Sequence, residues 1–177
     1  MLFRSDTLTA EAAKVPAGAD GVMWAPYLMG ERTPHLDSDI RGALIGLAAS
    51  HGLGHVTRAV LEGVAFSLRD SFTIFSEIGI PAERIRVGGG GARSALWRQI
   101  QADVYGLPVE TVAAEEGAAY GAALLAGVGA GVWASVDQAC DAVVKTASVT
   151  KPNAADAAFL ARRYEVFRKI YPALKMI

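Results

Sequence analysis

The stretch RIRVGGGGARSALWRQIQADVYGLPVETV, residues 84–112, decides the fold. Residues 84–87 are typical of a short β-strand, Ser94 can cap a helix over 95–105, and residues 109–112 predict a second strand. Strands separated by a helix of about ten residues pair in parallel through a right-handed crossover. The stretch therefore predicts an α/β layer, with four glycines between its first strand and its helix.

Hydrophobic periodicity places the other elements. A helix is predicted over 55–78, with an apolar stripe at every fourth residue, and Gly79 and Pro81 end it. An amphipathic helix is predicted over 154–174, and apolar runs at 22–29 and 42–47 predict strands or extended core segments. The stripe of the long helix consists of Val56, Val60, Val64, Leu68 and Phe72, and the tail helix carries Phe159, Tyr164, Phe167, Ile170 and Tyr171.

Length, charge and cysteine content exclude several classes of protein. The chain has 177 residues, 52% of them hydrophobic, which predicts one globular domain. Seventeen basic and eighteen acidic residues, without a basic run, argue against a nucleic-acid binder. The single cysteine, Cys140, excludes an internal disulfide and is predicted to be a small buried residue. No signal peptide is evident, so we expect a cytoplasmic protein.

Residues 117–136 contain no charge and are long enough to be tested as a membrane span. Glycine and alanine dominate them, no basic flank adjoins them, and they stand alone. We therefore predict a buried helix that begins near Glu115 or Glu116. The small residues of this helix allow close packing, and we expect no membrane partner.

The four glycines leave two interpretations open. A strand that ends at glycines before a helix exposes backbone amides and a helix N-terminus to an anion or a flat ring. The dinucleotide fingerprint fails because Arg93 stands where its third glycine is needed, and the Walker A pattern lacks its lysine. Alone, the glycines fit a nucleotide contact or a turn that only lets the helix pack tightly on the sheet.

Four linked motifs in a fixed order cover nearly the whole chain. They are APYLMGERTPH (25–35), GALIGLAASHGLGHVTRAVLE (42–62), VGGGGARSALWRQIQADVYGLPV (87–109) and EEGAAYGAALLAGVGAG (115–131). Their order and spacing resemble the FGGY carbohydrate kinases, and the xylulokinases among them in particular.

The resemblance implies an α/β fold that is part of an RNase H-like, actin-like ATPase domain. Residues 1–177 would form the C-terminal ATP-binding domain, incomplete on its N-terminal side, with the sugar-binding domain absent. Gly89, Gly90 and Gly91 would contact adenine and ribose, and Ser94 would lie near the ribose. The cofactors would be ATP and Mg²⁺, and the whole kinase would convert D-xylulose to D-xylulose 5-phosphate.

The same resemblance places the catalytic aspartate in the sugar-binding domain, so no catalytic or metal-ligating residue is expected within 1–177. We expect no sugar phosphorylation by this chain alone. Two alternatives stay open: a noncatalytic interaction module with the same fold, and a kinase for ribulose, gluconate or glycerol. An incomplete actin-like domain leaves a sheet edge and an apolar face uncovered, which predicts a homodimer.

Other polar and aromatic residues have simpler explanations. For Glu31, Arg32 and His35 we favour a structural, ion-paired loop over a phosphate contact. The remaining expectations are solvated helical charges at Arg58, Glu62, Arg98 and Asp103, core aromatics at Trp97 and Tyr105 rather than rings flanking a base, and no metal site at His51 and His55.

Overall fold

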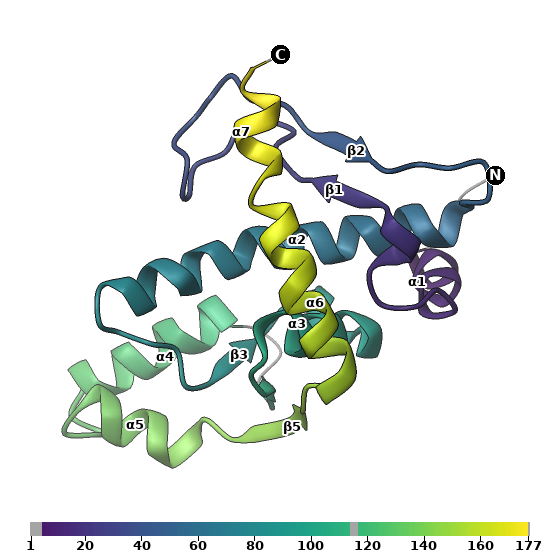
Figure 1. Cartoon of the computed structure of the whole chain (residues 1–177). Coiled ribbons are helices and arrows are strands. Elements are labelled where there is room, and N and C mark those ends of the chain that lie inside the picture. Colours follow the sequence, from purple (N-terminus) through teal and green to yellow (C-terminus); the bar gives the residue numbers. More distant parts are fainter. Residues whose placement is uncertain (1–4, 114–116, 177) are drawn as a thin grey trace.

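The computed structural model describes residues 5–113 and 117–176 and contains two separate β-sheets among helices (Figure 1). The helices are α1 (Ser5–Ala13), α2 (Leu53–Glu77), α3 (Ala95–Tyr105), α4 (Gly117–Gly129), α5 (Val136–Val143), α6 (Ala154–Phe167) and α7 (Ile170–Leu174), with 3-10 turns η1 (Ala19–Gly21) and η2 (Gly90–Arg93). The strands are β1 (Met23–Ala25), β2 (Ala43–Ile45), β3 (Ile85–Val87), β4 (Val109–Val112) and β5 (Thr146–Thr150).

The predicted strand–helix–strand unit is confirmed. Strands β3 and β4 pair in parallel, with Ile85 opposite Val109 and Val87 opposite Thr111, and α3 forms the crossover. Strand β5, which the sequence did not reveal, pairs antiparallel with the other edge of β4. Strands β1 and β2 form a separate antiparallel pair.

Helix α2 forms as predicted, but the predicted apolar stripe is not its buried face. Its buried residues are Arg58, Ala59, Glu62, Gly63, Ala65, Phe66 and Asp70, whereas Leu68 is 44% exposed. A strict spacing of four residues drifts around a helix of 3.6 residues per turn, so the stripe leaves the packed face. The packed face is the one that lies against β1, where a Cβ on Gly63 would come within 2.1 Å of the Trp24 carbonyl oxygen.

The glycine- and alanine-rich helix α4 is largely exposed, which corrects the prediction of a buried helix. Leu124 is its only buried residue, and Leu125 is 59% exposed. Close packing occurs only locally, because a Cβ on Gly127 would lie 2.5 Å from the Trp133 ring. Glu115 and Glu116 lie outside the described residues. None of the described helices is long and apolar enough to cross a membrane.

Two smaller predictions also need correction. Cys140 is only partly buried, because α5 packs its neighbour Ala139 inward. The tail helix divides into α6 and α7, and Phe159 is 38% exposed although the other predicted tail residues line the core or pack on it.

The main core joins segments that are distant in the sequence. In Figure 1, α2 runs between the β1–β2 pair and the part that holds β3, α4 and α5, with α6 crossing it. Buried side chains from these elements meet in one cluster of Met23, Ala25, Tyr27, Ile40, Ala65, Phe66, Ile100, Val104, Leu160, Tyr164, Phe167 and Ile170. This core holds α3, and with it the glycine turn, against α2.

Candidate functional site

The glycine turn connects the end of β3 to the start of α3. The amide of Ala92 donates to the carbonyl of Gly89 and that of Ser94 to the carbonyl of Gly91, each at 3.1 Å. Gly89 has φ +73° and ψ −174°, a conformation that is accessible essentially only to glycine. The backbone conformation of the turn therefore requires glycine at position 89.

Helix packing does not explain the other glycines. A Cβ added to Gly88, Gly89 or Gly90 would meet no atom within 4 Å, and on Gly91 the nearest atom would be in the Trp97 ring at 3.4 Å. A turn that needed glycine for tight contact with a helix or sheet would show close neighbours there. The space in front of these residues is instead open, which leaves room for a ligand to approach the backbone.

Ser94 is the N-cap of α3, as predicted. Its hydroxyl oxygen accepts a hydrogen bond from the Trp97 amide at 3.2 Å. The hydroxyl hydrogen can still donate, because a serine hydroxyl accepts and donates at the same time. Capping and a ribose contact are therefore compatible roles for this residue.

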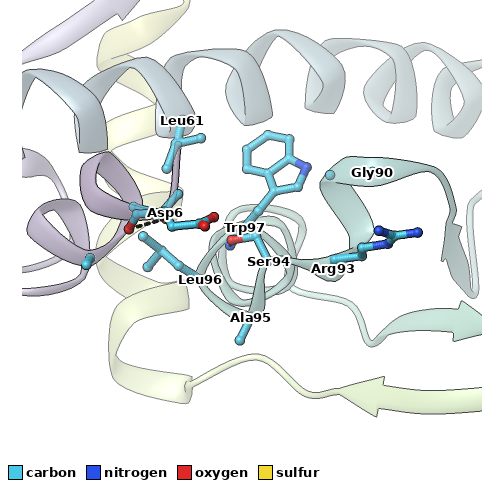
Figure 2. Close-up of a pocket in the computed structure, with 11 residues that line it drawn as sticks. Asp6, Leu61, Gly90, Arg93, Ser94, Ala95, Leu96 and Trp97 are labelled. Atoms are coloured by element: carbon cyan, nitrogen blue, oxygen red, sulfur yellow. Dashed lines mark hydrogen bonds between the residues drawn. The ribbon is translucent and has the colours of Figure 1, made fainter. Parts of the chain in front are cut away.

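A cavity of about 800 Å³ opens beside the turn (Figure 2). Of the predicted site residues, Gly90, Gly91 and Ser94 line it. Gly89 instead borders a smaller cavity of about 230 Å³ on the β4 side of the turn, together with Arg98 and Thr111. The other lining residues of the large cavity are the apolar Ala10, Leu61, Ala95, Leu96 and Trp97 and the polar Asp6, Thr9 and Arg93.

Sequence reasoning missed the contribution of α1. Asp6, Thr9 and Ala10 complete the wall opposite the turn, although some eighty residues of chain separate them from the glycines. No local motif marks them, because only the packing of α1 against α2 brings them to the cavity. Leu61 lies within a quoted motif, but its position in the cavity was not foreseen.

Arg58 and Glu62 form a buried ion pair, which corrects the expectation of solvated charges. Arg58 Nε lies 2.8 Å from Glu62 Oε1, and the two residues are 8% and 2% exposed. Arg58 also donates to the Val15 carbonyl, and the Gly18 amide donates to Glu62. Burial raises the pKa of the Glu62 carboxyl, although these bonds oppose the shift. The pair anchors the segment between α1 and β1.

Arg98 and Asp103 are likewise structural rather than solvated. A guanidinium nitrogen of Arg98 donates to the Ala92 carbonyl and so braces the glycine turn. Asp103 is 2% exposed and accepts hydrogen bonds from the Gln99 side chain at 2.9 Å and the Asn153 amide at 2.6 Å. The expectation of solvated charges was wrong for both residues. Arg98 has a partner in the glycine turn, and Asp103 has one in the N-cap residue of α6.

The loop that contains Glu31 and His35 is held by its own contacts. The Glu31 carboxylate accepts the amides of Thr33 and His35, each at 2.9 Å. The His35 ring stacks on Tyr171 with 3.5 Å between centroids, and the Tyr171 hydroxyl donates to Asp37 at 3.0 Å. The structural interpretation is favoured, although backbone bonds and stacking replace the expected ion pairs. Arg32 is exposed and borders a different cavity from the glycine turn.

The remaining predictions concern the histidines and two aromatic residues. His51 Nδ1 accepts the Ala48 amide, and His55 Nε2 lies 3.1 Å from Asp20 Oδ2. In the described part of the chain, no three His, Cys, Asp or Glu side chains are grouped so as to hold a metal. Tyr105 packs edge-on against Phe72 at 4.8 Å, and burial raises its pKa to about 12. Trp97, unlike Tyr105, both packs on the core and lines the large cavity.

The α/β unit with a glycine turn and an open cavity beside it is an arrangement typical of ligand-binding domains. Residues 4–130 match the model of the FGGY family of carbohydrate kinases, C-terminal domain. This chain therefore belongs to the FGGY family of carbohydrate kinases, and its fold is that of their actin-like C-terminal domain.

Named relatives support this assignment. Xylulose kinase of Bacillus subtilis (strain 168) is 38% identical over 161 residues, which are 91% of this chain and 32% of that protein. The crystal structure of xylulose kinase from Rhodospirillum rubrum superimposes with a TM-score of 0.84 at 38% identity, over 96% of this chain and 34% of that one. Glycerol kinase of Gloeobacter violaceus is 43% identical over 130 residues, 73% of this chain and 26% of that protein. The chain thus spans about a third of the length of these xylulose kinases.

Proposed function

We propose that this chain is the ATP-binding C-terminal domain of a kinase that transfers the γ-phosphate of ATP to D-xylulose. The observation that carries the nucleotide part is the open glycine turn, where Cβ atoms at residues 88–90 would meet nothing within 4 Å beside a cavity of about 800 Å³. A backbone without side chains lets a flat base or a sugar ring reach van der Waals contact.

The cavity has the chemistry that adenosine requires. Its apolar residues offer surface to a purine, and its polar lining includes Thr9, Ser94 and Asp6, whose side-chain oxygen atoms can pair with polar groups of a ribose or base. We propose Gly90, Gly91 and Ser94 as direct contacts, with the backbone conformation of Gly89 shaping the turn that presents them. The described residues form no acidic cluster for Mg²⁺, so we propose that Mg²⁺ enters with the phosphates.

The identity of the acceptor sugar is a separate part of the proposal. The xylulose kinases among the relatives support D-xylulose, while a glycerol kinase at 43% identity keeps another acceptor alcohol as an alternative. We propose that the catalytic aspartate and the sugar contacts belong to a sugar-binding domain outside these 177 residues. These residues alone would then bind nucleotide without turning over sugar.

A nucleotide titration of the purified chain tests the proposal. The unfolding midpoint should rise with MgADP concentration in the wild type, because a ligand that binds only the folded state stabilises it. Gly90→Leu should abolish the rise, since its side chain would fill the open space at the turn. Gly121→Leu is the matched control, because its Cβ also meets nothing within 4 Å but lies on α4, away from the cavity.

Three outcomes would contradict different parts of the proposed function. A wild-type midpoint that ignores MgADP would contradict the nucleotide proposal and favour the noncatalytic interaction module. Equal responses in the wild type and Gly90→Leu would place the nucleotide elsewhere on the domain. Xylulose-dependent ATP turnover by the chain alone would contradict the proposed division between two domains.

We also propose that the domain forms a homodimer in the cytoplasm. Support comes from exposed apolar side chains on α2 and α4, where Leu68, Phe75 and Leu125 are 44%, 46% and 59% exposed. Light scattering coupled to size-exclusion chromatography measures the mass directly. A monomer at micromolar concentration would overturn this part of the proposal.

A further inference from the structure

Trp97 lies in the first turn of α3, between the core and the large cavity. Trp97 packs against the main core cluster but is only partly buried. Figure 2 shows the ring extending from α3 toward α2, beside Gly90. Its Cδ1 and Nε1 atoms are the ones nearest to a Cβ placed on Gly91, at 3.4 and 3.5 Å. The pyrrole edge of the indole therefore faces the glycine turn.

The indole N–H has no acceptor within residues 5–113 and 117–176, since the only hydrogen bond of Trp97 outside the helix ladder is that of its backbone amide to Ser94. The nitrogen is also not among the buried side-chain atoms that lack a partner, so it reaches open space. In Figure 2 the nitrogen lies on the side of the ring nearer to Gly90. A tryptophan that serves only the core normally has its N–H paired or directed to bulk solvent, whereas this one borders the cavity.

We propose that Trp97 contacts the nucleotide directly, with its indole N–H donating a hydrogen bond to an acceptor atom of the adenosine moiety while the ring forms one wall of its pocket. The acceptor is a purine ring nitrogen or a ribose oxygen, both of which accept from N–H donors. The inference rests on the proposed nucleotide function. A Cβ on Gly91 would lie at ordinary van der Waals distance from the indole edge and would cover the atoms that we propose the nucleotide meets.

A purely structural role makes a different prediction. Trp97→Phe keeps an aromatic ring on the core and removes the N–H, so a core tryptophan would lose stability without any change in ligand affinity. If the N–H contacts the nucleotide, the dissociation constant for ADP should rise about 2- to 10-fold in this variant, the usual effect of one neutral hydrogen bond. Affinity and stability must therefore be measured separately.

The experiment is calorimetric titration of the full chain with ADP, together with tryptophan fluorescence during the same titration. Trp133→Phe is the matched control, because Trp133 is also partly buried but packs against α4. We expect weaker binding and loss of the ADP-dependent fluorescence change in Trp97→Phe, and neither effect in Trp133→Phe. Unchanged affinity in Trp97→Phe would overturn the inference and leave the nucleotide function intact.

A measurement on the unaltered chain covers the case in which Trp97→Phe fails to fold. In NMR spectra of wild-type chain with isotope-labelled tryptophan, ADP should shift the indole N–H resonance of Trp97, which lines the cavity, and leave that of Trp133 unchanged. ADP binding without a shift of the Trp97 indole N–H would overturn the inference. A wild-type chain that binds no ADP at all would overturn the proposed function and this inference together, which distinguishes it from failure of the inference alone.

Discussion

The carboxylate of Glu62 on α2 accepts the backbone amide of Gly18 at 2.9 Å through one oxygen and at 3.1 Å through the other. Gly18 has φ +87° and precedes η1, which leads into β1. An acid in the middle of the longest helix thus holds the segment that follows α1, the helix that supplies one wall of the cavity.

Removal of the Glu62 charge should strongly destabilise the domain. Glu62→Gln leaves the Arg58 guanidinium buried without a counter-ion, and breaking a buried pair from one side costs about 3 kcal/mol. Urea denaturation measures the loss. The control is Glu165→Gln, whose partner Arg168 is 3.9 Å away at the surface, and we expect a change below about 1 kcal/mol. Similar losses in both variants would contradict the role of the buried pair.

Gly63 should not tolerate any side chain. A Cβ would lie 2.1 Å from the Trp24 carbonyl oxygen, so Gly63→Ala must push α2 away from β1. We expect a loss of about 3 kcal/mol or more in thermal unfolding experiments. Gly121→Ala on the open face of α4 should instead stabilise by about 0.5–1 kcal/mol, because alanine favours helix. A neutral Gly63→Ala would mean that the helix and the strand lie farther apart.

Alanine substitutions in the glycine turn should reduce stability at Gly89 but not at Gly88 or Gly90. Gly89→Ala forces a side chain into a conformation with φ +73° and should cost about 1–3 kcal/mol in free energy of unfolding. Gly88→Ala and Gly90→Ala meet open space without positive φ, so their stability should stay within about 0.5 kcal/mol of the wild type. Chemical denaturation checks all three, and a large loss in Gly90→Ala would restore the interpretation of a packed turn.

Asp70 should make stability depend on pH. It is 8% exposed, and burial raises the pKa of its carboxyl above the ordinary value of 3.8, although the hydrogen bond from the Tyr164 hydroxyl lowers it. A raised folded-state pKa gives stability that is present below about pH 4 and lost as the pH rises through the folded-state value. The wild type should therefore lose stability relative to Asp70→Asn as the pH increases from about 4.

Urea denaturation at several pH values between about 4 and 7 tests this prediction. Tyr164→Phe removes the bond that lowers the pKa of Asp70, so the loss should extend to higher pH in that variant. Parallel stability profiles for the wild type and Asp70→Asn would show that the carboxyl does not titrate differently in the folded state.

Local patterns identified the unit that carries the site. A short strand, glycines, a capping serine and a helix with period 3.6 were visible in residues 84–112, and each formed where predicted. These features depend on neighbours within a few residues, so sequence order specifies them. The contribution of α1 to the cavity and the third strand β5 depend on contacts across many residues, which no local period encodes.

The sequence by itself determined the order of the elements, the position of the glycine turn and the resemblance to a kinase family. Only the tertiary structure decided which charges are buried, because the partners of Glu62 and Asp103 include backbone amides 44 and 50 residues away. It also decided that the glycines face open space and that the indole N–H of Trp97 borders the cavity. Hydrophobic periodicity predicts that a helix has a packed face, but the surface that meets it settles which residues that face contains.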